Sequence, residues 1–278
     1  MSPIPAPESA LSVPKRRRRA PSPRAALGFR DGEKGAHSSR TIMLAEITTL
    51  LAATTATTTR QDFRSLILGE NLLGKRTESN RIRADRYLSQ LYGLDPSIPI
   101  YRIFRRLWDA DPTSRPLLAL LAATARDPLV RASAPGIVAI PVGEGVDPTR
   151  VAATLAAVSP RFKANTSASM ARNVGSSFTQ SGHLQGVSNK VRIRATATPA
   201  AATFAAALGW MEGGRGQFLL SSSWARLLDR NAAEVLDLLL AAGRAGWIDV
   251  RSAAGVVELR MERLFTPTEM ELCDGQSD

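Results

Sequence analysis

Alanine and leucine make up most of the apolar residues of this 278-residue chain, and they recur at the spacing of helices rather than of strands. In the segment TIMLAEITTLLAAT, for example, Met43, Ile47, Leu50 and Leu51 fall on one helical face. Apolar residues are 44% of the chain, whereas aromatic residues are only 5%. This composition allows substantial cores and favours a mainly α fold in which β structure is confined to short hairpins.

The N-terminal half is predicted to be entirely helical. Threonines precede the segment RQDFRSLILGENLL, the segment KRTESNRIRADRYLSQLYG ends at Gly93, and Pro116 suits the first turn of another helix. We therefore predict an N-terminal helical domain at 39–132. On the long polar helix that ends at Gly93, the face opposite the apolar stripe carries Arg81, Arg83 and Arg86, countered by Glu78 and Asp85.

A second region begins at the segment SAPGIVAIPVGEGVDP, whose three prolines and three glycines are typical of a connector. Helices at 147–158 and 166–182 and a strand at 189–198 follow, so residues 133–198 are predicted to form a helix-turn-helix segment with a wing-like strand. Residues 199–265 predict three helices and a hairpin, the order of a winged helix. Small α+β domains share this order.

Both ends of the chain are predicted to be disordered tails. Residues 1–38 are rich in proline, serine and arginine, with a basic run at Lys15–Arg19, and residues 266–278 are acidic.

The longest apolar stretch, Leu117–Ala123, is far shorter than the roughly 20 residues that span a bilayer, and no secretory signal precedes it. One cysteine, Cys273, provides neither a disulfide nor a metal site. We expect a cytoplasmic protein without cofactor or metal.

The positive charge is unevenly distributed. The chain has a net charge of +11, to which residues 1–40 contribute +6, residues 41–130 +3, residues 131–200 +6 and residues 201–278 −4. A basic segment beside an acidic domain favours a localised nucleic-acid surface over general basicity.

The segment NVGSSFTQSGHLQG, residues 173–186, contains His183 among serines and could suggest a hydrolase. A Ser–His nucleophile needs an orienting acid, yet only Glu144 and Asp147 are acidic between residues 131 and 200. The chain also has neither a G-x-S-x-G elbow nor a phosphate-binding G-x-x-x-x-G-K-[ST] string. We therefore predict that the protein is not an enzyme and that His183 packs at a helix end.

The helix at 166–182 is better interpreted as a recognition helix. Met170, Val174 and Phe178 mark its buried face, which leaves polar side chains on the other side. We expect these to contact DNA bases or phosphates: Ser169, Arg172, Asn173, Ser176, Thr179 and Gln180. On the following strand, Val191, Ile193 and Ala195 are expected inside, with Lys190, Arg192 and Arg194 facing the DNA backbone. A solvated polar helix beside a charged strand is the alternative.

The acidic C-terminal domain supports a second hypothesis, a protein-protein adaptor or assembly subunit. An exposed patch around Trp210, Trp224 or Trp247 would favour it. Core packing of these tryptophans is the simpler expectation.

Two segments resemble a known family. LGENLLGKRTESNRIRADRYLSQLY is similar to the NLL-KR region of BrxA-type proteins of bacteriophage-exclusion (BREX) defence systems. TSASMARNVGSSFTQSGHLQG, followed by NKVR, resembles a second element of that family, a helix that ends in a glycine-marked turn before a basic strand. The likeness covers about residues 40–265, whereas the chain is longer than expected and residues 1–38 have no counterpart.

The resemblance implies a small, non-enzymatic component with winged-helix domains that binds double-stranded DNA and is encoded beside a methyltransferase and an ATPase. Lys75 and Arg76 match the first motif. The second motif contains Asn173, Ser176, Thr179 and Gln180.

Overall fold

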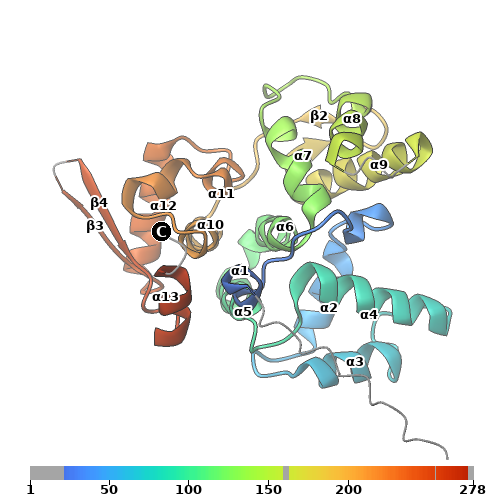
Figure 1. Ribbon diagram of the computed structural model, residues 1–278, viewed down its shortest axis with the longest axis horizontal. Coiled ribbons are helices and arrows are strands. Elements are labelled where there is room, and N and C mark those ends of the chain that lie inside the picture. Colours follow the sequence, from blue (N-terminus) through green and yellow to red (C-terminus); the bar gives the residue numbers. More distant parts are fainter. Residues whose placement is uncertain (1–21, 159–162, 254, 275–278) are drawn as a thin grey trace, which may run out of the picture.

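The computed structural model describes residues 22–158, 163–253 and 255–274, and helices dominate it, as predicted. Three groups of elements are visible in Figure 1. The helices α2–α4 lie together, α7–α9 form a second group with the β1–β2 pair, and α10–α13 form a third with the β3–β4 pair. The helices α1, α5 and α6 lie between these groups.

The first group follows from local signals in the sequence. Thr59 and Asp62 form a reciprocal capping box at the start of α3, and Gly93, at φ 94°, ends α4. The elements of this group and of the central region are α1 (Pro23–Leu27), η1 (Ala36–Ser38), α2 (Leu44–Ala52), α3 (Arg60–Leu68), α4 (Glu78–Tyr92), α5 (Pro99–Ala110), η2 (Pro112–Ser114) and α6 (Arg115–Arg126).

The second group comprises α7 (Pro128–Val138), α8 (Pro148–Val158), α9 (Ala164–Gln180), β1 (Leu184–Gln185) and β2 (Val191–Arg192). The strands β1 and β2 are antiparallel, and residues 143–146 run along the other edge of β2. Three backbone hydrogen bonds hold this edge, among them Gly143 N to Arg192 O at 2.8 Å and Arg192 N to Glu144 O at 2.9 Å. The paired strand is therefore much shorter than the predicted 189–198.

The prediction of a connector at 133–148 is wrong for its first residues. The helix α7 continues through Pro135 to Val138. Proline removes one backbone donor, but Ser133, Ala134 and Ile137 remain on the buried face of this helix. Packing against the core outweighs the missing hydrogen bond.

The third group comprises α10 (Pro199–Met211), η3 (Gly216–Ser221), α11 (Ser223–Arg226), α12 (Ala232–Arg244), β3 (Asp249–Ala253), β4 (Val256–Arg260) and α13 (Pro267–Asp274). The strands β3 and β4 form the predicted antiparallel hairpin. The helix α10 is buried all round and packs against α5, α6 and α12, which places it at the junction of the groups. Trp210 and Trp224 are buried, as core packing predicts, whereas Trp247 is only half-buried.

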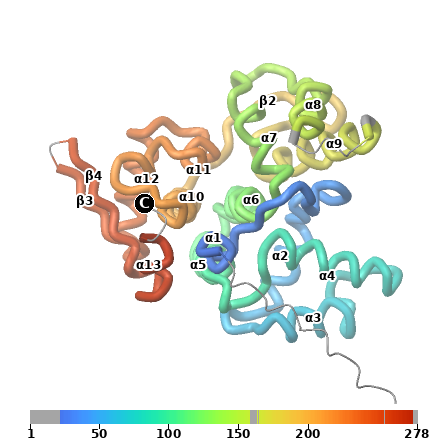
Figure 2. The backbone as a smooth tube through the Cα atoms, viewed as in Figure 1, coloured from blue at the N-terminus to red at the C-terminus, as the bar shows by residue number. Residues whose placement is uncertain are grey.

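Both predicted tails contain ordered structure. Residues 22–38 hold α1 and η1, and Leu27, Phe29 and His37 are buried there, so the prediction of disorder for 1–38 is wrong in this part. Figure 2 shows this segment crossing from α1 past α6 towards α9. The buried apolar residues of this segment are too few to form a periodic pattern in the sequence. The run Lys15–Arg19 lies outside the described residues.

The acidic C-terminal segment is likewise not a disordered tail up to residue 274. It forms α13, in which Cys273 is fully buried. Arg102 of α5 forms an ion pair with Glu269 and donates to Leu264 O at 2.9 Å, which ties this segment to the central helices. In the described part of the chain, no helix is long and apolar enough to cross a membrane.

Candidate nucleic-acid interface

The helix α9 has the buried face that the sequence predicts. Met170, Val174 and Phe178 are fully buried, and α9 packs mainly against α8. The polar residues on the rest of the helix form two stripes, because side chains three or four positions apart lie one above the other. The outer stripe, as we call it, comprises Ser169, Arg172, Ser176 and Thr179. The inner stripe comprises Asn173, Ser177 and Gln180.

The outer stripe is the part of the predicted interface that the fold leaves exposed or half-buried. Arg172 is exposed, and Ser169, Ser176 and Thr179 are half-buried. Lys190, next to β2, crosses this helix: its side chain lies over Gly175, where an added Cβ would meet Lys190 at 3.3 Å. The Lys190 ammonium donates to Thr179 Oγ1 at 3.0 Å and to Gly186 O at 3.2 Å. The helix and the β1–β2 hairpin thus present one continuous surface.

The inner stripe is engaged within the protein, which corrects the prediction for two of its residues. Asn173 Nδ2 donates to His37 O at 3.0 Å. The Gln180 amide accepts from Leu44 N at 3.2 Å and donates to Thr41 Oγ1 at 3.1 Å. These amides hold the segment before α2 against α9 and are already occupied by it, so they are not placed to read bases.

The predicted alternation after residue 190 is wrong for Arg192. Its side chain is 1% exposed, whereas that of Val191 is 38% exposed. Arg192 forms an ion pair with Asp229 and donates to His183 O at 3.1 Å, and the Asp229 carboxylate also accepts from Ala195 N at 3.0 Å. The partner of Arg192 comes from the segment before α12, so the local alternation could not reveal it. Arg192 therefore joins the second group to the third.

The other predicted contacts are dispersed. Arg194 is exposed and lies 3.6 Å from Glu234, while Lys75 forms a 2.9 Å ion pair with Glu46. Arg76 is exposed in the loop between α3 and α4. The last two belong to the first group of helices, apart from α9 and its hairpin.

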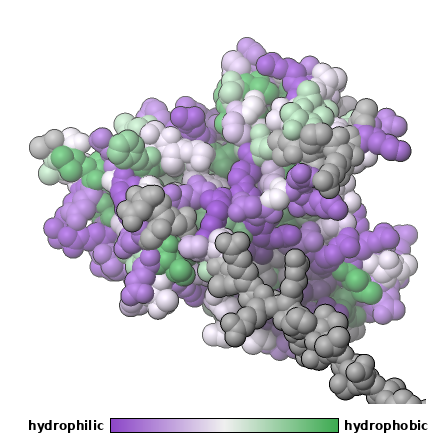
Figure 3. All heavy atoms as spheres, in the orientation of Figure 1, coloured by the Kyte–Doolittle hydropathy of each residue, from purple (hydrophilic) through white to green (hydrophobic). Residues whose placement is uncertain are grey.

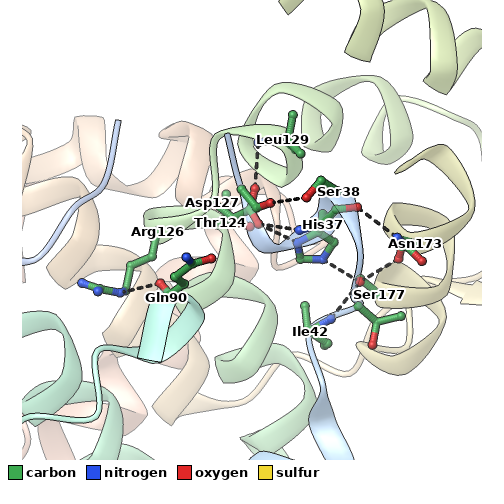
Figure 4. Close-up of polar contacts among 12 residues, drawn as sticks. His37, Ser38, Ile42, Gln90, Thr124, Arg126, Asp127, Leu129, Asn173 and Ser177 are labelled. Carbon is green, nitrogen blue, oxygen red and sulfur yellow. Dashed lines mark hydrogen bonds and ion pairs between the residues drawn. The ribbon is translucent and has the colours of Figure 1, made fainter. Parts of the chain in front are cut away.

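A buried histidine in the segment predicted as an N-terminal tail connects three parts of the chain. Figure 4 shows His37 between Asp127 and Ser177. Its Nδ1 lies 2.9 Å from Asp127 Oδ2, and its Nε2 lies 2.8 Å from Ser177 Oγ. The Ser177 hydroxyl also accepts from Ile42 N at 3.0 Å and lies 2.9 Å from Asn173 O. Asp127 caps α7 by accepting from Leu129 N at 2.9 Å.

These atoms have the order of a hydrolase triad, but their surroundings give them a structural role. His37 and Ser177 are fully buried and Asp127 is 1% exposed, so no substrate reaches the serine in this arrangement. Burial raises the pKa of Asp127, but the charge and hydrogen bonds of His37 outweigh this effect and hold the pKa below its ordinary value. An ionised Asp127 therefore fixes His37 and the segment around it.

His183 packs at the end of α9, as expected. Its Nδ1 lies 2.8 Å from Ser181 Oγ, and its Nε2 lies 2.9 Å from Leu227 O. Burial lowers the pKa of His183 to about 4, and the Arg192 charge acts in the same direction against the opposing effects of Asp229 and Leu227 O. A neutral imidazole that donates from Nε2 and accepts at Nδ1 satisfies both contacts.

No protein-family model matches this chain, and a search of curated proteins finds no similar sequence.

Proposed function

We propose that the protein is a non-enzymatic DNA-binding component of a BREX-type phage-defence system, and that it contacts duplex DNA through the outer stripe of α9 and the β1–β2 hairpin. One observation carries the proposed DNA contact: Arg172 and Lys190 lie on a continuous surface with three hydroxyl side chains. The order α7, α8, α9 and hairpin supports a winged helix-turn-helix, in which α9 would be the recognition helix.

The charge around this surface favours an anionic partner. Residues 131–200 have a net charge of +6, and their only carboxylates are those of Glu144 and Asp147. The hydroxyl groups of Ser169 and Ser176 can donate to phosphate oxygens, while that of Thr179 donates to Gly175 O at 3.0 Å. The amides that would pair with base edges belong to the inner stripe. We therefore propose binding mainly through phosphates, with little discrimination between sequences.

Titration of a labelled duplex at two salt concentrations tests this function. The variant carries Arg172→Glu and Lys190→Glu, and it retains Arg192 because that side chain is buried in an ion pair. The matched control carries Arg226→Glu and Arg251→Glu, two exposed positions of the C-terminal group.

We expect the Arg172/Lys190 variant to bind at least about tenfold more weakly, with a salt slope reduced by about 0.9 for each phosphate that the variant no longer neutralises. The control should bind like the natural protein. Equal affinity of variant and natural protein would refute the proposed surface.

An adaptor role is the second candidate, and two exposed apolar side chains favour it. Phe218 is 73% exposed and Val256 69% exposed, in the neighbouring elements η3 and β4. Figure 3 shows hydrophobic side chains near the tip of the β3–β4 hairpin. Association through this surface would be weakened by Phe218→Ser and would depend little on salt, which distinguishes it from DNA binding.

A further inference from the structure

A groove between the first group of helices and the central segments beside it is lined by five arginines from four different segments. Arg60 and Arg64 lie one turn apart on α3, Arg86 comes from α4, and Arg30 and Arg126 complete the lining. The helices α3 and α4 pack against each other, as Figures 1 and 2 show. The α9 surface includes none of these five residues, and of the five only Arg86 lies within the segment that resembles the NLL-KR region.

The groove has an excess of positive charge. Among the described residues that line it, Asp85 is the only carboxylate, and it is shared by Arg60 at 2.6 Å and Arg64 at 3.6 Å. Arg30 and Arg126 donate instead to the carbonyl oxygen of Gln90, at 3.4 and 3.1 Å. Backbone carbonyls satisfy hydrogen-bond donors but neutralise no charge.

The pKa of Arg126 reflects both its burial and a neighbouring positive charge. Burial, together with the smaller effect of the Arg30 charge, lowers the pKa of Arg126 to about 10. Arg126 remains charged at neutral pH, so the repulsion persists in the folded protein. An anion in the groove would relieve it.

The groove combines an unpaired buried donor with exposed guanidinium groups that such an anion can reach. The Nη1 atom of Arg60 is buried without a hydrogen-bond partner among the described residues. The side chain of Arg64 is 56% exposed, and Arg86 is exposed while its Nη2 donates to Tyr87 OH at 2.7 Å. Guanidinium groups match the geometry of phosphate oxygens, because their planar N–H groups donate in pairs.

We propose that this arginine groove binds the phosphate backbone of the same nucleic acid, as a second contact surface beside α9 and its hairpin. The choice of partner rests on the proposed function, while the groove itself rests on its own charges and unpaired donors. The described residues that line it offer no aromatic face for stacking bases, and the nearby Tyr87 lies beneath Arg86, whose guanidinium is 4.6 Å from the ring centroid. Arginines without a base platform fit the backbone rather than the bases.

The experiment uses the full chain and compares three double variants in a duplex-DNA titration over a salt series. The groove variant carries Arg64→Gln and Arg86→Gln, and it keeps Arg60 so that the buried Asp85 stays paired. Its matched control carries Arg226→Gln and Arg251→Gln. The third is the Arg172→Glu, Lys190→Glu variant of the α9 surface, and thermal melting shows that each variant is folded.

We expect the groove variant to weaken binding at least about tenfold and to reduce the salt slope by about 2, while the control changes neither. Should the groove variant lose its thermal transition, Arg86→Gln alone replaces it, with about half of the slope change expected.

The two proposals fail in different ways. If the groove variant binds like its control while the α9 variant loses affinity, the groove proposal is overturned and the proposed function stands. If only the groove variant loses affinity, the groove is supported and the α9 surface is refuted. If the natural protein binds no duplex at low salt, both are overturned.

Discussion

Acid should destabilise this protein through His183, because the folded chain keeps that imidazole neutral. Burial lowers the pKa of His183 to about 4, compared with 6.5 for an exposed histidine. The unfolded chain therefore binds more protons than the folded chain between these two pKa values. The stability that this group contributes is fully present above pH 6.5 and is lost as the pH falls towards 4.

The magnitude follows from the two pKa values. At pH 5 an exposed imidazole is almost entirely protonated, whereas only about one-tenth of folded molecules carry a proton on His183. Between pH 7 and pH 5 this difference lowers the free energy of unfolding by about 2 kcal/mol. Such a loss is a large share of the 5–15 kcal/mol typical of folded domains.

Urea unfolding at pH 7 and pH 5 measures the loss, and the variant His183→Gln isolates it. Glutamine retains a donor towards Leu227 O but does not titrate, so the difference between the two proteins reports the protonation of His183. The natural protein should lose about 2 kcal/mol more than His183→Gln between the two pH values. Equal losses in the two proteins would refute the assignment of a neutral, buried His183.

Three substitutions and one control substitution test other contacts by urea or thermal unfolding. Arg192→Met should cost about 3–5 kcal/mol, because it leaves a partly buried carboxylate without its partner, and a cost below about 1 kcal/mol would contradict this role. Gly35→Ala would place a Cβ 1.8 Å from Asp127 Oδ1 and should lower the free energy of unfolding by more than about 2 kcal/mol. Its control is Gly136→Ala in α7, where the added Cβ meets open space, so this change should be neutral or slightly stabilising. Thr59→Ala removes the cap of α3 and should cost about 1 kcal/mol; no change would mean that the capping box contributes nothing.

The helices were predictable because their signals are local. Thr59 and Asp62 are three residues apart, and Gly93 ends α4 at a position where a positive φ is required. The same signals made Pro135 look like a break, because sequence spacing does not reveal how firmly the buried side of α7 is packed. Local rules therefore identify most elements and fail where tertiary packing outweighs them.

The buried polar networks were not predictable, since their members are distant in sequence. His37 meets Asp127 and Ser177, which lie 90 and 140 positions further along the chain. Arg192 meets Asp229 across 37 positions. An arginine on a short strand is usually exposed, and only the arrival of a carboxylate at the same place makes its burial favourable.

The two stripes of α9 show why residue type alone could not define the interface. Asn173 and Gln180 are good partners for base edges, but their amides are equally good partners for the backbone and hydroxyl groups of residues 37–44. The N-terminal segment occupies these amides, and what remains outside is Arg172, Lys190 and small hydroxyls. Such groups suit contacts to phosphates rather than to base edges. If the proposed function is correct, discrimination between DNA sequences must then come from the shape of the duplex or from a partner protein, because the residues best suited to read bases hold the fold together.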